Sequence, residues 1–259
     1  MTVFVYLLDM KLRDWIFFVT LFIFITSCKD DKVFEPAPLI NNLKVTMQPT
    51  FGANDLQLDQ IVTTSEGYNV QFTDIKCYFT SVKNGANELC QAALYDFRQT
   101  GTFVFQKEGK PENFESFTSF LGVDPLYNHQ DPSAFPNDNP LNISIANDMH
   151  WDWNPGYIFL KVEAKVDTLN DGIDNFNHFV IFHVGSDAII QTLSFTSVNW
   201  ISSGEGLFML PLKLDLQKFL QNGAQVIDLK TEHSSHSAAG QEALSLKVIQ
   251  NFKDAISIY

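Results

Sequence analysis

Apolar and charged residues alternate strictly along Leu160-Lys161-Val162-Glu163-Ala164-Lys165-Val166. A period of two places the apolar side chains on one face of an extended chain and the charged side chains on the other. Asn154-Pro155-Gly156 stands shortly before this run, and proline followed by glycine supplies the backbone angles of a tight turn. The chain is therefore expected to form a strand with one buried and one solvated face, entered through a turn.

Other segments carry a similar signature, with turn residues between them. Strands are expected at Leu43 to Pro49, Tyr68 to Val82 (as a strand pair), Leu89 to Phe97, Phe103 to Phe105, Phe114 to Leu121, Phe176 to Val184, Ala188 to Phe195, Leu207 to Leu216 and Val226 to Leu229. Hairpins are expected about Asn84-Gly85 and about Gly185-Ser186-Asp187. Pro211 cannot donate a ladder hydrogen bond, so it indicates an edge or a bulge.

Two segments depart from this pattern. Asp124 to Asn147 has no periodicity and is expected to be a long loop. Leu244, Val248, Phe252 and Ala255 recur at helical spacing and predict one short helix. The fold class expected is all-β: an antiparallel β-sandwich, Greek-key-like, with one short C-terminal helix.

The beginning of the chain has the composition of an export signal. Met10-Lys11-Leu12-Arg13 is basic, and Trp15 to Thr26 carries no charge but is too short to span a bilayer. Ile25-Thr26-Ser27-Cys28 resembles the lipobox of bacterial lipoproteins, which implies cleavage before Cys28 and its acylation. The alternative is an ordinary signal peptide. We expect a signal peptide over 1–27, a tether over 28–42, one domain over 43–259, and a lipid anchor in the cell envelope, at the outer membrane on its periplasmic or surface face.

The formal net charge of −13 argues against nucleic acid as a partner, because such binding needs clustered lysine and arginine. Apart from Cys28, which the lipobox resemblance assigns to acylation, the chain holds Cys77 and Cys90. In an oxidising compartment such a pair favours a disulfide over a metal site. The two residues flank the expected hairpin turn, so we predict a bridge between adjacent strands.

Met149-His150-Trp151-Asp152-Trp153 gathers two of the four tryptophans beside the turn. Imidazole and thioether groups are intermediate-to-soft ligands, which suits copper better than calcium or magnesium. In an extended chain Met149 and Trp151 share a face, and His150 points the other way. The alternative to a metal-binding role for the tryptophans is core packing or the stacking of carbohydrate rings.

The other candidate ligands lie further along the chain. His183 shares a face with Phe179 and Ile181, where an imidazole is more often a core residue than a ligand. His233 and His236 stand in a polar segment, where solvated side chains are the rule. The sequence contains no Gly-x-Ser-x-Gly or His-Glu-x-x-His motif, so a hydrolase or a copper oxidase ranks behind a binding protein.

The stretch Met149-His150-Trp151-Asp152-Trp153-Asn154-Pro155-Gly156-Tyr157-Ile158-Phe159 resembles the Met-x-Trp-x-Trp-x-x-Gly-Tyr-x-Phe signature of the MbnP-like copper-binding domain family. Other blocks resemble the family in the same order. They are Phe72 to Val82, Gly122-Val123-Asp124, Phe182-His183-Val184-Gly185 and the segment Ala243 to Phe252.

The resemblance implies an extracytoplasmic β-sandwich that binds copper, as Cu(I), and is not an enzyme. It implies that Trp151 or Trp153 is oxidised to kynurenine by a partner di-haem cytochrome c peroxidase-like enzyme. Met149 is then the neighbour of the site, His183 its first ligand, and His236 and His233 the next candidates. The alternative is a glycan- or protein-binding surface module with Trp151, Trp153 and Tyr157 as an aromatic platform.

Overall fold

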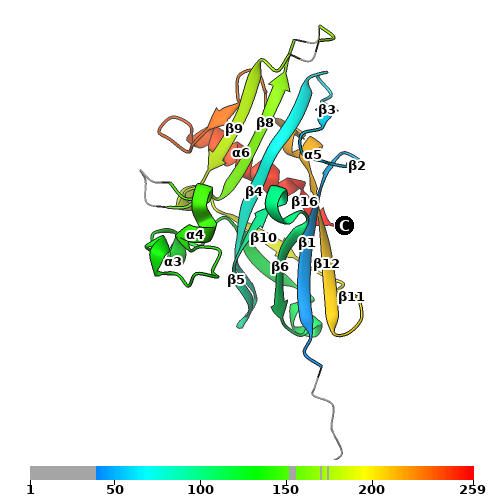
Figure 1. The fold of residues 1–259 in the computed structure, drawn as a ribbon, viewed down its shortest axis with the longest axis vertical. Helices are drawn as coiled ribbons and strands as arrows, with labels where there is room; N and C mark the ends of the chain where they lie inside the picture. Colours follow the sequence, from blue (N-terminus) through cyan, green and yellow to red (C-terminus); the bar gives the residue numbers. More distant parts are fainter. Residues whose placement is uncertain (1–38, 152–155, 170, 174) are drawn as a thin grey trace, which may run out of the picture. The chain divides into compact units, whose positions relative to one another are not determined.

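The computed structural model describes residues 39–151, 156–169, 171–173 and 175–259, and Leu39 to Tyr259 form one compact unit built on two β-sheets (Figure 1). The expected signal peptide, Cys28, Trp153 and the Asn154-Pro155 part of the turn lie outside the described residues.

The first sheet runs β11–β12–β1–β2, with β6 beside β1 and β16 beside β12. Its strands are β1 (Asn42–Phe51), β2 (Asn54–Asp55), β6 (Phe103–Glu108), β11 (Ile201–Ser202), β12 (Leu207–Asp215) and β16 (Ile256–Ile258). Side chains of β1 alternate as the sequence predicts, and Leu43, Val45 and Met47 are buried.

The second sheet runs β10–β7–β4–β8–β9–β15, with β3 and β5 also paired to β4. Its strands are β3 (Ile61–Thr63), β4 (Asn69–Asn84), β5 (Asn87–Asp96), β7 (Phe117–Leu121), β8 (Leu160–Asp167), β9 (His178–Val184), β10 (Gln191–Phe195) and β15 (Ser234–Ser235). The strand pair expected over Tyr68 to Val82 is the single long strand β4. Strand β8 buries Leu160, Val162 and Ala164, as its alternation predicts.

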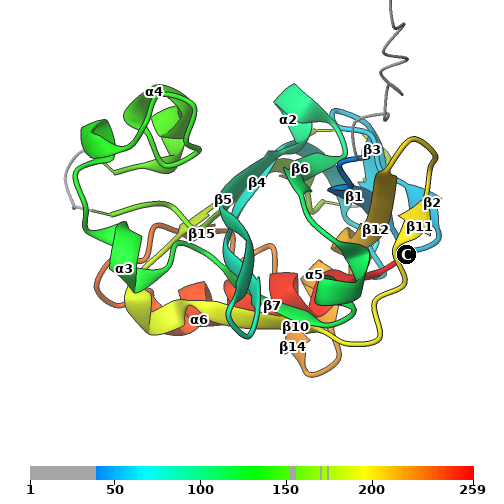
Figure 2. The ribbon, with the colours of Figure 1, turned by 90° about the horizontal axis from the view of Figure 1, so that it is seen from below.

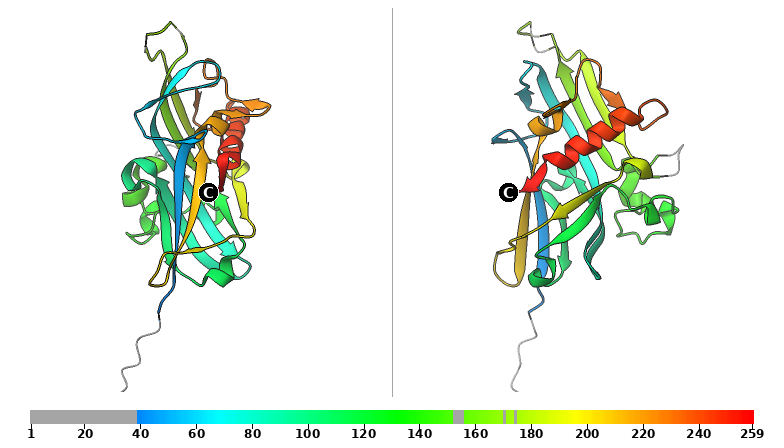
Figure 3. Two further views of the ribbon diagram at one scale, coloured as in Figure 1. Left: turned by 90° about the vertical axis from the view of Figure 1, so that its right-hand side faces the viewer. Right: turned by 180° about the vertical axis from the view of Figure 1, so that it is seen from behind.

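The helices are short apart from α6. They are α2 (Phe97–Thr100), α3 (Pro125–Asn128), α4 (Ile143–Ala146), α5 (Leu216–Leu220), α6 (Glu242–Ala255) and the 3-10 turns η1 (Pro111–Phe114), η2 (Pro132–Ala134), η3 (Asn147–Met149) and η4 (Asp187–Ile189). Helix α6 contacts β9 and β10 of one sheet and β12 of the other, and so covers the core between them (Figures 2 and 3). No helix within the described residues is long and apolar enough to cross a membrane.

The all-β prediction is confirmed, with two pairings that differ from an antiparallel sandwich. Strands β1 and β12 are parallel, and so are β15 and β9. Pro211 lies in β12 between the residues paired to β11 and those paired to β16. On that edge Pro211 faces Tyr259, whose N–H donates to the Pro211 carbonyl at 2.9 Å, so the proline accepts a hydrogen bond there and donates none.

Two sequence predictions are wrong. Phe176 to Phe195 is not a hairpin, because β9 pairs with β8 and β15 whereas β10 pairs with β7. Val226 to Leu229 is not a strand: only Gln225–Val226 form a ladder, the two-residue hairpin of β14 with β13 (Gln221–Asn222). Ile227 and Leu229 are buried without a sheet around them, so alternation there reflects burial alone.

The predicted disulfide is also absent, and Cys77 and Cys90 are free and buried. The β4–β5 hairpin about Asn84-Gly85 does form, but it pairs Cys77 with Tyr95 and Cys90 with Val82. A cross-strand bridge needs the two Cα atoms within about 7 Å. The offset along β4, roughly 3.3 Å for each residue between positions 77 and 82, puts them out of range. Burial raises the pKa of Cys90 to about 11 and the pKa of Cys77 well above its usual value.

The segment between β7 and β8 is not a featureless loop. It folds into α3, η2, α4 and η3 and packs on the outer face of β4 and β8 (Figure 1). The hydroxyl of Tyr78 donates to the carbonyl of Pro140 at 3.1 Å, and that of Tyr157 to the carbonyl of Leu141 at 2.5 Å. These bonds fix the segment that leads into Met149.

Candidate metal centre

Met149 to Trp151 forms a short extended segment against Gly156 to Ile158. The Ile158 N–H donates to the Met149 carbonyl at 2.9 Å, and the Trp151 N–H donates to the Gly156 carbonyl at 3.2 Å. Met149 is fully buried and Trp151 is 5% exposed, whereas His150 is half-buried with its ring 5.0 Å from that of Tyr157. The predicted alternation is therefore confirmed for Met149, His150 and Trp151.

Asn128 anchors the far side of this segment. Its side-chain oxygen accepts from the Tyr157 N–H at 2.9 Å, and its amide donates to Asp187 at 2.7 Å. Asp187 also lies 2.9 Å from Nε2 of His129. A Cβ on Gly156 would stand 3.3 Å from the Asn128 oxygen, so only a small residue fits comfortably there. Asn128 is 3% exposed, and sequence reasoning gave it no role.

Two glycines explain why distant sequence blocks meet at this segment. A Cβ on Gly185 would lie 2.4 Å from the Tyr157 carbonyl oxygen. A Cβ on Gly122, whose φ is +121°, would lie 2.5 Å from the ring of Phe159. Both backbones therefore approach the segment Tyr157–Phe159 more closely than a side chain permits. The blocks Gly122-Val123-Asp124 and His183-Val184-Gly185 converge on the tryptophan stretch in space.

The structure divides four histidines into two pairs. His183 and His236 have ring centroids 5.2 Å apart, and His178 and His233 have theirs 5.1 Å apart. Strands β9 and β15 are parallel, with Ser235 opposite Phe182. Alternation from this register directs the first pair to the outer face of the sheet and the second pair to the inner face. His233 therefore does not join His183 and His236.

The outer face of β9 is not the core side. Phe179, which shares a face with His183, is 58% exposed, whereas Val180, Phe182 and Val184 are buried. The interpretation of His183 as a core histidine is therefore wrong. Its side chain is 20% exposed, which leaves the imidazole partly accessible to a ligand.

A carboxylate holds His183. Nε2 of the imidazole lies 2.8 Å from Oε1 of Glu163. The hydrogen bond with His183, together with the nearby Lys161 ammonium, lowers the pKa of Glu163 below its usual value. Partial burial and the neighbouring His183 lower the pKa of His236. A lower pKa keeps the His236 ring neutral, which is the form that binds metal ions.

Two lysines and three aspartates extend this contact into an ionic cluster. The ammonium of Lys161 lies 2.6 Å from Asp148, 3.1 Å from Asp74 and 3.4 Å from Glu163. That of Lys76 lies 3.1 Å from both Asp96 and Asp148 and 3.6 Å from Asp74. Asp148 immediately precedes Met149, so the cluster fastens the tryptophan segment to the sheet.

The cluster shifts the titration of its members. Burial by itself would lower the pKa of Lys161, but the hydrogen bond to Asp148 and the charges of Glu163 and Asp74 raise it above its usual value. Burial by itself would raise the pKa of Asp148, but hydrogen bonds from Lys161 and Lys76 lower it. The sequence contained a signal for Lys161 and Glu163, since their alternation placed both on the face opposite the core. It contained none for Asp148.

The candidate centre lacks a complete ligand shell. Across the residues that the structure describes, no group of three or more His, Cys, Asp or Glu side chains is arranged to hold a metal ion. No hydrogen bond, ion pair or ring contact joins Met149 or Trp151 to His183 within the same residues. The indole N–H of Trp151 is buried and has no partner among them. The donors that fit a soft ion are two imidazoles and one thioether.

The aromatic-platform alternative is not supported by burial. A stacking platform needs exposed ring faces. Trp151 is 5% exposed and Tyr157 is 0% exposed, so these two rings present no such surface. Trp153 lies outside the described residues.

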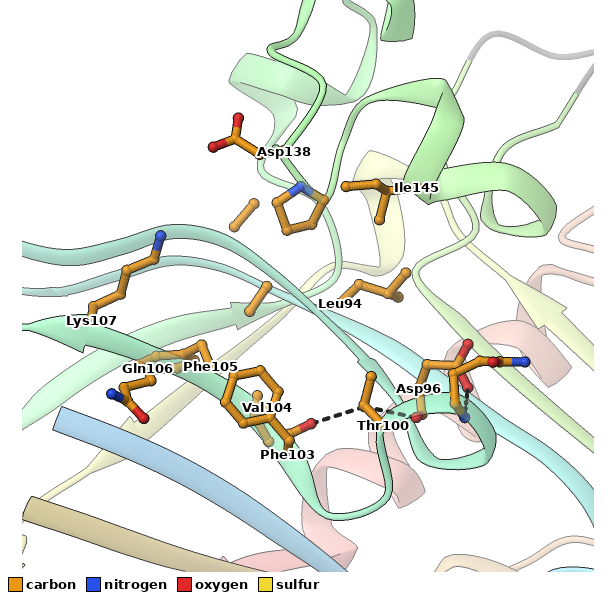
Figure 4. A pocket seen from close by; sticks show the side chains of 14 residues that line it. Leu94, Asp96, Thr100, Phe103, Val104, Phe105, Gln106, Lys107, Asp138 and Ile145 are labelled. Carbon is orange, nitrogen blue, oxygen red and sulfur yellow. Dashed lines mark hydrogen bonds between the residues drawn. The ribbon is translucent and has the colours of Figure 1, made fainter. Parts of the chain in front are cut away.

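A separate groove lies away from the histidines. It has a volume of about 390 Å³ and runs between β5, β6 and the segment that carries Asp138 and Ile145 (Figure 4). Its lining is mostly apolar and includes Leu94, Val104 and Phe105. None of the candidate ligands lines it, so it is not part of the candidate centre.

Fold and site together define an all-β sandwich protein with a paired-histidine centre beside a buried tryptophan segment. The MbnP family profile matches residues 40–238, and the chain belongs to this family. A solved structure, MbnP from Methylosinus trichosporium, aligns with a TM-score of 0.46 and 14% identity, over 84% of this chain and 98% of that chain. A search of curated proteins finds no match.

Proposed function

We propose that this chain is an extracytoplasmic lipoprotein that binds copper, as Cu(I), for copper handling, and that it is a binding protein and not an enzyme. The observation that supports this best is the pair His183 and His236, whose ring centroids are 5.2 Å apart and in which His183 contacts the Glu163 carboxylate at 2.8 Å. Two imidazoles that bind one ion at about 2.0 Å and a near-tetrahedral angle have centroids about 5 Å apart. The pair therefore has the spacing of a shared metal site.

A third donor for the ion would come from the tryptophan segment, which the Asp148–Lys161 ion pair holds to the strand beside His183. Met149, which follows Asp148 in sequence, offers a thioether. Cu(I) accepts such nitrogen and sulfur ligands. Cu(I), when bound, would accept electron pairs from these donors, and the fold of the chain would hold the donor side chains in position.

Oxidation of Trp151 or Trp153 to kynurenine is part of this proposal. A di-haem cytochrome c peroxidase-like partner would use two equivalents of hydrogen peroxide as the oxidant and reduce them to water, because the step is a four-electron oxidation. One oxygen atom adds to C2 and one to C3 of the indole, and the C2–C3 bond breaks. Hydrolysis then releases C2 as formate and leaves an aryl ketone and a primary aromatic amine. The indole N–H of Trp151 is buried and has no hydrogen-bond partner in the described structure. In kynurenine an aromatic amine and a ketone oxygen would take its place, and both groups can act as metal ligands.

The lipid anchor and the location complete the proposal. Cys28 at the end of Ile25-Thr26-Ser27-Cys28 would carry the acyl chains and hold the domain at the cell envelope, outer membrane included. The acidic net charge of −13 suits a cation-binding protein and disfavours nucleic acid.

Titration of the metal-free lipoprotein with Cu(I) against a competing chelator tests copper binding. We expect one site with sub-micromolar affinity. The double variant His178→Ala/His233→Ala, which removes the inner pair, should keep this site. Absence of a sub-micromolar site in protein isolated from its native host would refute the proposal.

Peptide mass spectrometry of the same native protein tests the modification. We expect the mass of kynurenine at residue 151 or 153, and the unmodified mass in protein made without the di-haem partner. Unmodified tryptophan at both positions in the native protein would refute this part alone.

A further inference from the structure

Glu163 contacts the imidazole of His183, one of the two proposed copper ligands. Its Oε1 lies 2.8 Å from Nε2 of His183 and 3.4 Å from the ammonium of Lys161. The side chain of His183 is 20% exposed, that of Glu163 33% and that of Lys161 10%. Solvent therefore competes only in part for these contacts. The carboxylate is therefore a defined partner of one particular ring nitrogen.

The chemistry of this contact determines where the imidazole carries its proton. An ionised carboxylate only accepts hydrogen bonds, so Nε2 of His183 must be the donor. The same Glu163 oxygen lies 3.4 Å from the Lys161 ammonium, a group that only donates, so Oε1 is the acceptor in both contacts. In a neutral ring with the proton on Nε2, the lone pair is on Nδ1.

We propose that Glu163 is a positioning residue that holds His183 in the Nε2–H form, so that Nδ1 is the atom that binds copper. This inference rests on the proposed function. Carboxylates that accept from the second nitrogen of a metal-binding histidine fix its tautomer and orientation, and their loss weakens metal binding about 10–100-fold. Here the Glu163 carboxylate stands in that position relative to His183, at 2.8 Å from Nε2.

Lys161 extends the same positioning to the other half of the centre. Its ammonium contacts Glu163 and also Asp148, which directly precedes Met149. One ammonium thus holds the carboxylate that orients His183 and the carboxylate that fixes the tryptophan segment. The contacts of Lys161 with Glu163 and Asp148 therefore link the His183 side of the centre to the tryptophan segment.

His236 differs from His183 in this respect. Within the described residues no hydrogen bond reaches its ring nitrogens, although its backbone N–H donates to Gln241 at 2.8 Å. Its backbone is held and its ring is not oriented by a carboxylate. We therefore expect a single tautomer for His183 and an unrestricted one for His236.

Nitrogen-15 NMR of the histidine rings in the metal-free full domain tests the inference without copper. We expect wild-type His183 to show protonated Nε2 and unprotonated Nδ1. In Glu163→Gln the amide can donate or accept, so His183 should become a mixture of tautomers. Glu88→Gln, an exposed carboxylate of β5, is the matched control and should leave the His183 signals unchanged.

Addition of Cu(I) completes the test. We expect the Nδ1 signal of His183 to shift on binding, and Glu163→Gln to weaken Cu(I) binding about 10–100-fold, with no such loss in Glu88→Gln. Protonated Nδ1 in the metal-free wild type, equal tautomer mixtures in wild type and Glu163→Gln, or a Cu(I) shift at Nε2 would each overturn the inference. The expected tautomer without any Cu(I) binding would instead refute the proposed function.

Discussion

The two histidine pairs at β9 and β15 are alike in spacing and unlike in surroundings. Their ring centroids are 5.2 and 5.1 Å apart, and each pair joins one residue of β9 to one residue beside β15. His183 lies opposite Lys161 and contacts Glu163, whereas His178 lies opposite buried Val166. No hydrogen bond to the rings of His178 and His233 exists among the described residues.

This comparison shows that distance between imidazoles is a poor guide to function on its own. A pair with a carboxylate behind it has a fixed proton position and a charged environment that suits a cation. The pair on the inner face lacks that support within the described residues. We therefore expect copper to distinguish the two pairs, and four variants test the difference.

The largest effect is expected for His183→Ala. Loss of a direct ligand should weaken Cu(I) binding by more than about 100-fold, because loss of a supporting group alone costs about 10–100-fold. Competition with a chelator measures it, with His178→Ala as the matched variant on the opposite face. Equal losses in the two variants would remove the distinction between the pairs.

Lys161→Met is expected to have the second largest effect, on folding. It removes one ammonium from three carboxylates, so that Asp74 and Asp148 must share Lys76 and Glu163 keeps only His183. Breaking a fully buried pair costs about 3–5 kcal/mol, and since Asp148 is 40% exposed we expect about 2 kcal/mol at neutral pH. Chemical denaturation measures the free energy of unfolding, and Lys165→Met, an exposed lysine on the same strand, should lie near wild type.

The pH dependence of this loss follows from the pKa shifts. Asp148 and Glu163 have lowered pKa values, so their ionised forms stabilise the fold above their unfolded pKa values of about 4. That contribution is lost as pH falls through the folded pKa values. The difference between wild type and Lys161→Met should therefore shrink below about pH 4. A difference that stays constant down to pH 2.5 would show that the cluster is not its source.

Gly185→Ala is expected to have an intermediate effect, on the stability of the fold beside the outer pair. The new Cβ would lie 2.4 Å from the Tyr157 carbonyl and 2.8 Å from the Phe159 nitrogen, so the backbone must move. Overpacking of this kind costs about 1–3 kcal/mol. The control is Ser186→Ala, one residue further on. Thermal unfolding measures the cost, and an unchanged Gly185→Ala midpoint would mean that the close approach relaxes freely.

The smallest effect is expected for His178→Ala. Among the described residues no carboxylate contacts the inner pair, so Cu(I) affinity should stay within about threefold of wild type, or roughly 0.6 kcal/mol. The chelator competition that measures His183→Ala measures this variant too. A loss above tenfold would place a ligand on the inner face and contradict the assignment of the site.

Local patterns in the sequence predicted much of the fold and part of the site. The period-two alternation predicted β1, β8 and β9, the Asn-Gly turn predicted the β4–β5 hairpin, and helical spacing predicted α6. The order of the sequence blocks identified the family, which the profile match confirms. Each of these signals depends only on residues close together in the chain or on their order along it.

Partner choice between distant strands was beyond such signals. The hairpin expected about Gly185-Ser186-Asp187 fails because β9 finds β8 and β15, and the expected disulfide fails because the register offsets Cys77 from Cys90. Both outcomes depend on which strands pair and in which register. Local alternation is the same for every choice of partner.

The sequence by itself determined which residues alternate along a strand. It therefore determined that His183 shares a face with Phe179 and Ile181, and that Glu163 shares a face with Lys161 and Lys165. Only the tertiary structure decided that the face of His183 is the outer one, that His236 and not His233 joins it, and that Asp148 reaches Lys161. The physical reason is that side-chain pairing across strands and the packing of the segment between β7 and β8 are long-range contacts, which no short stretch of chain encodes alone.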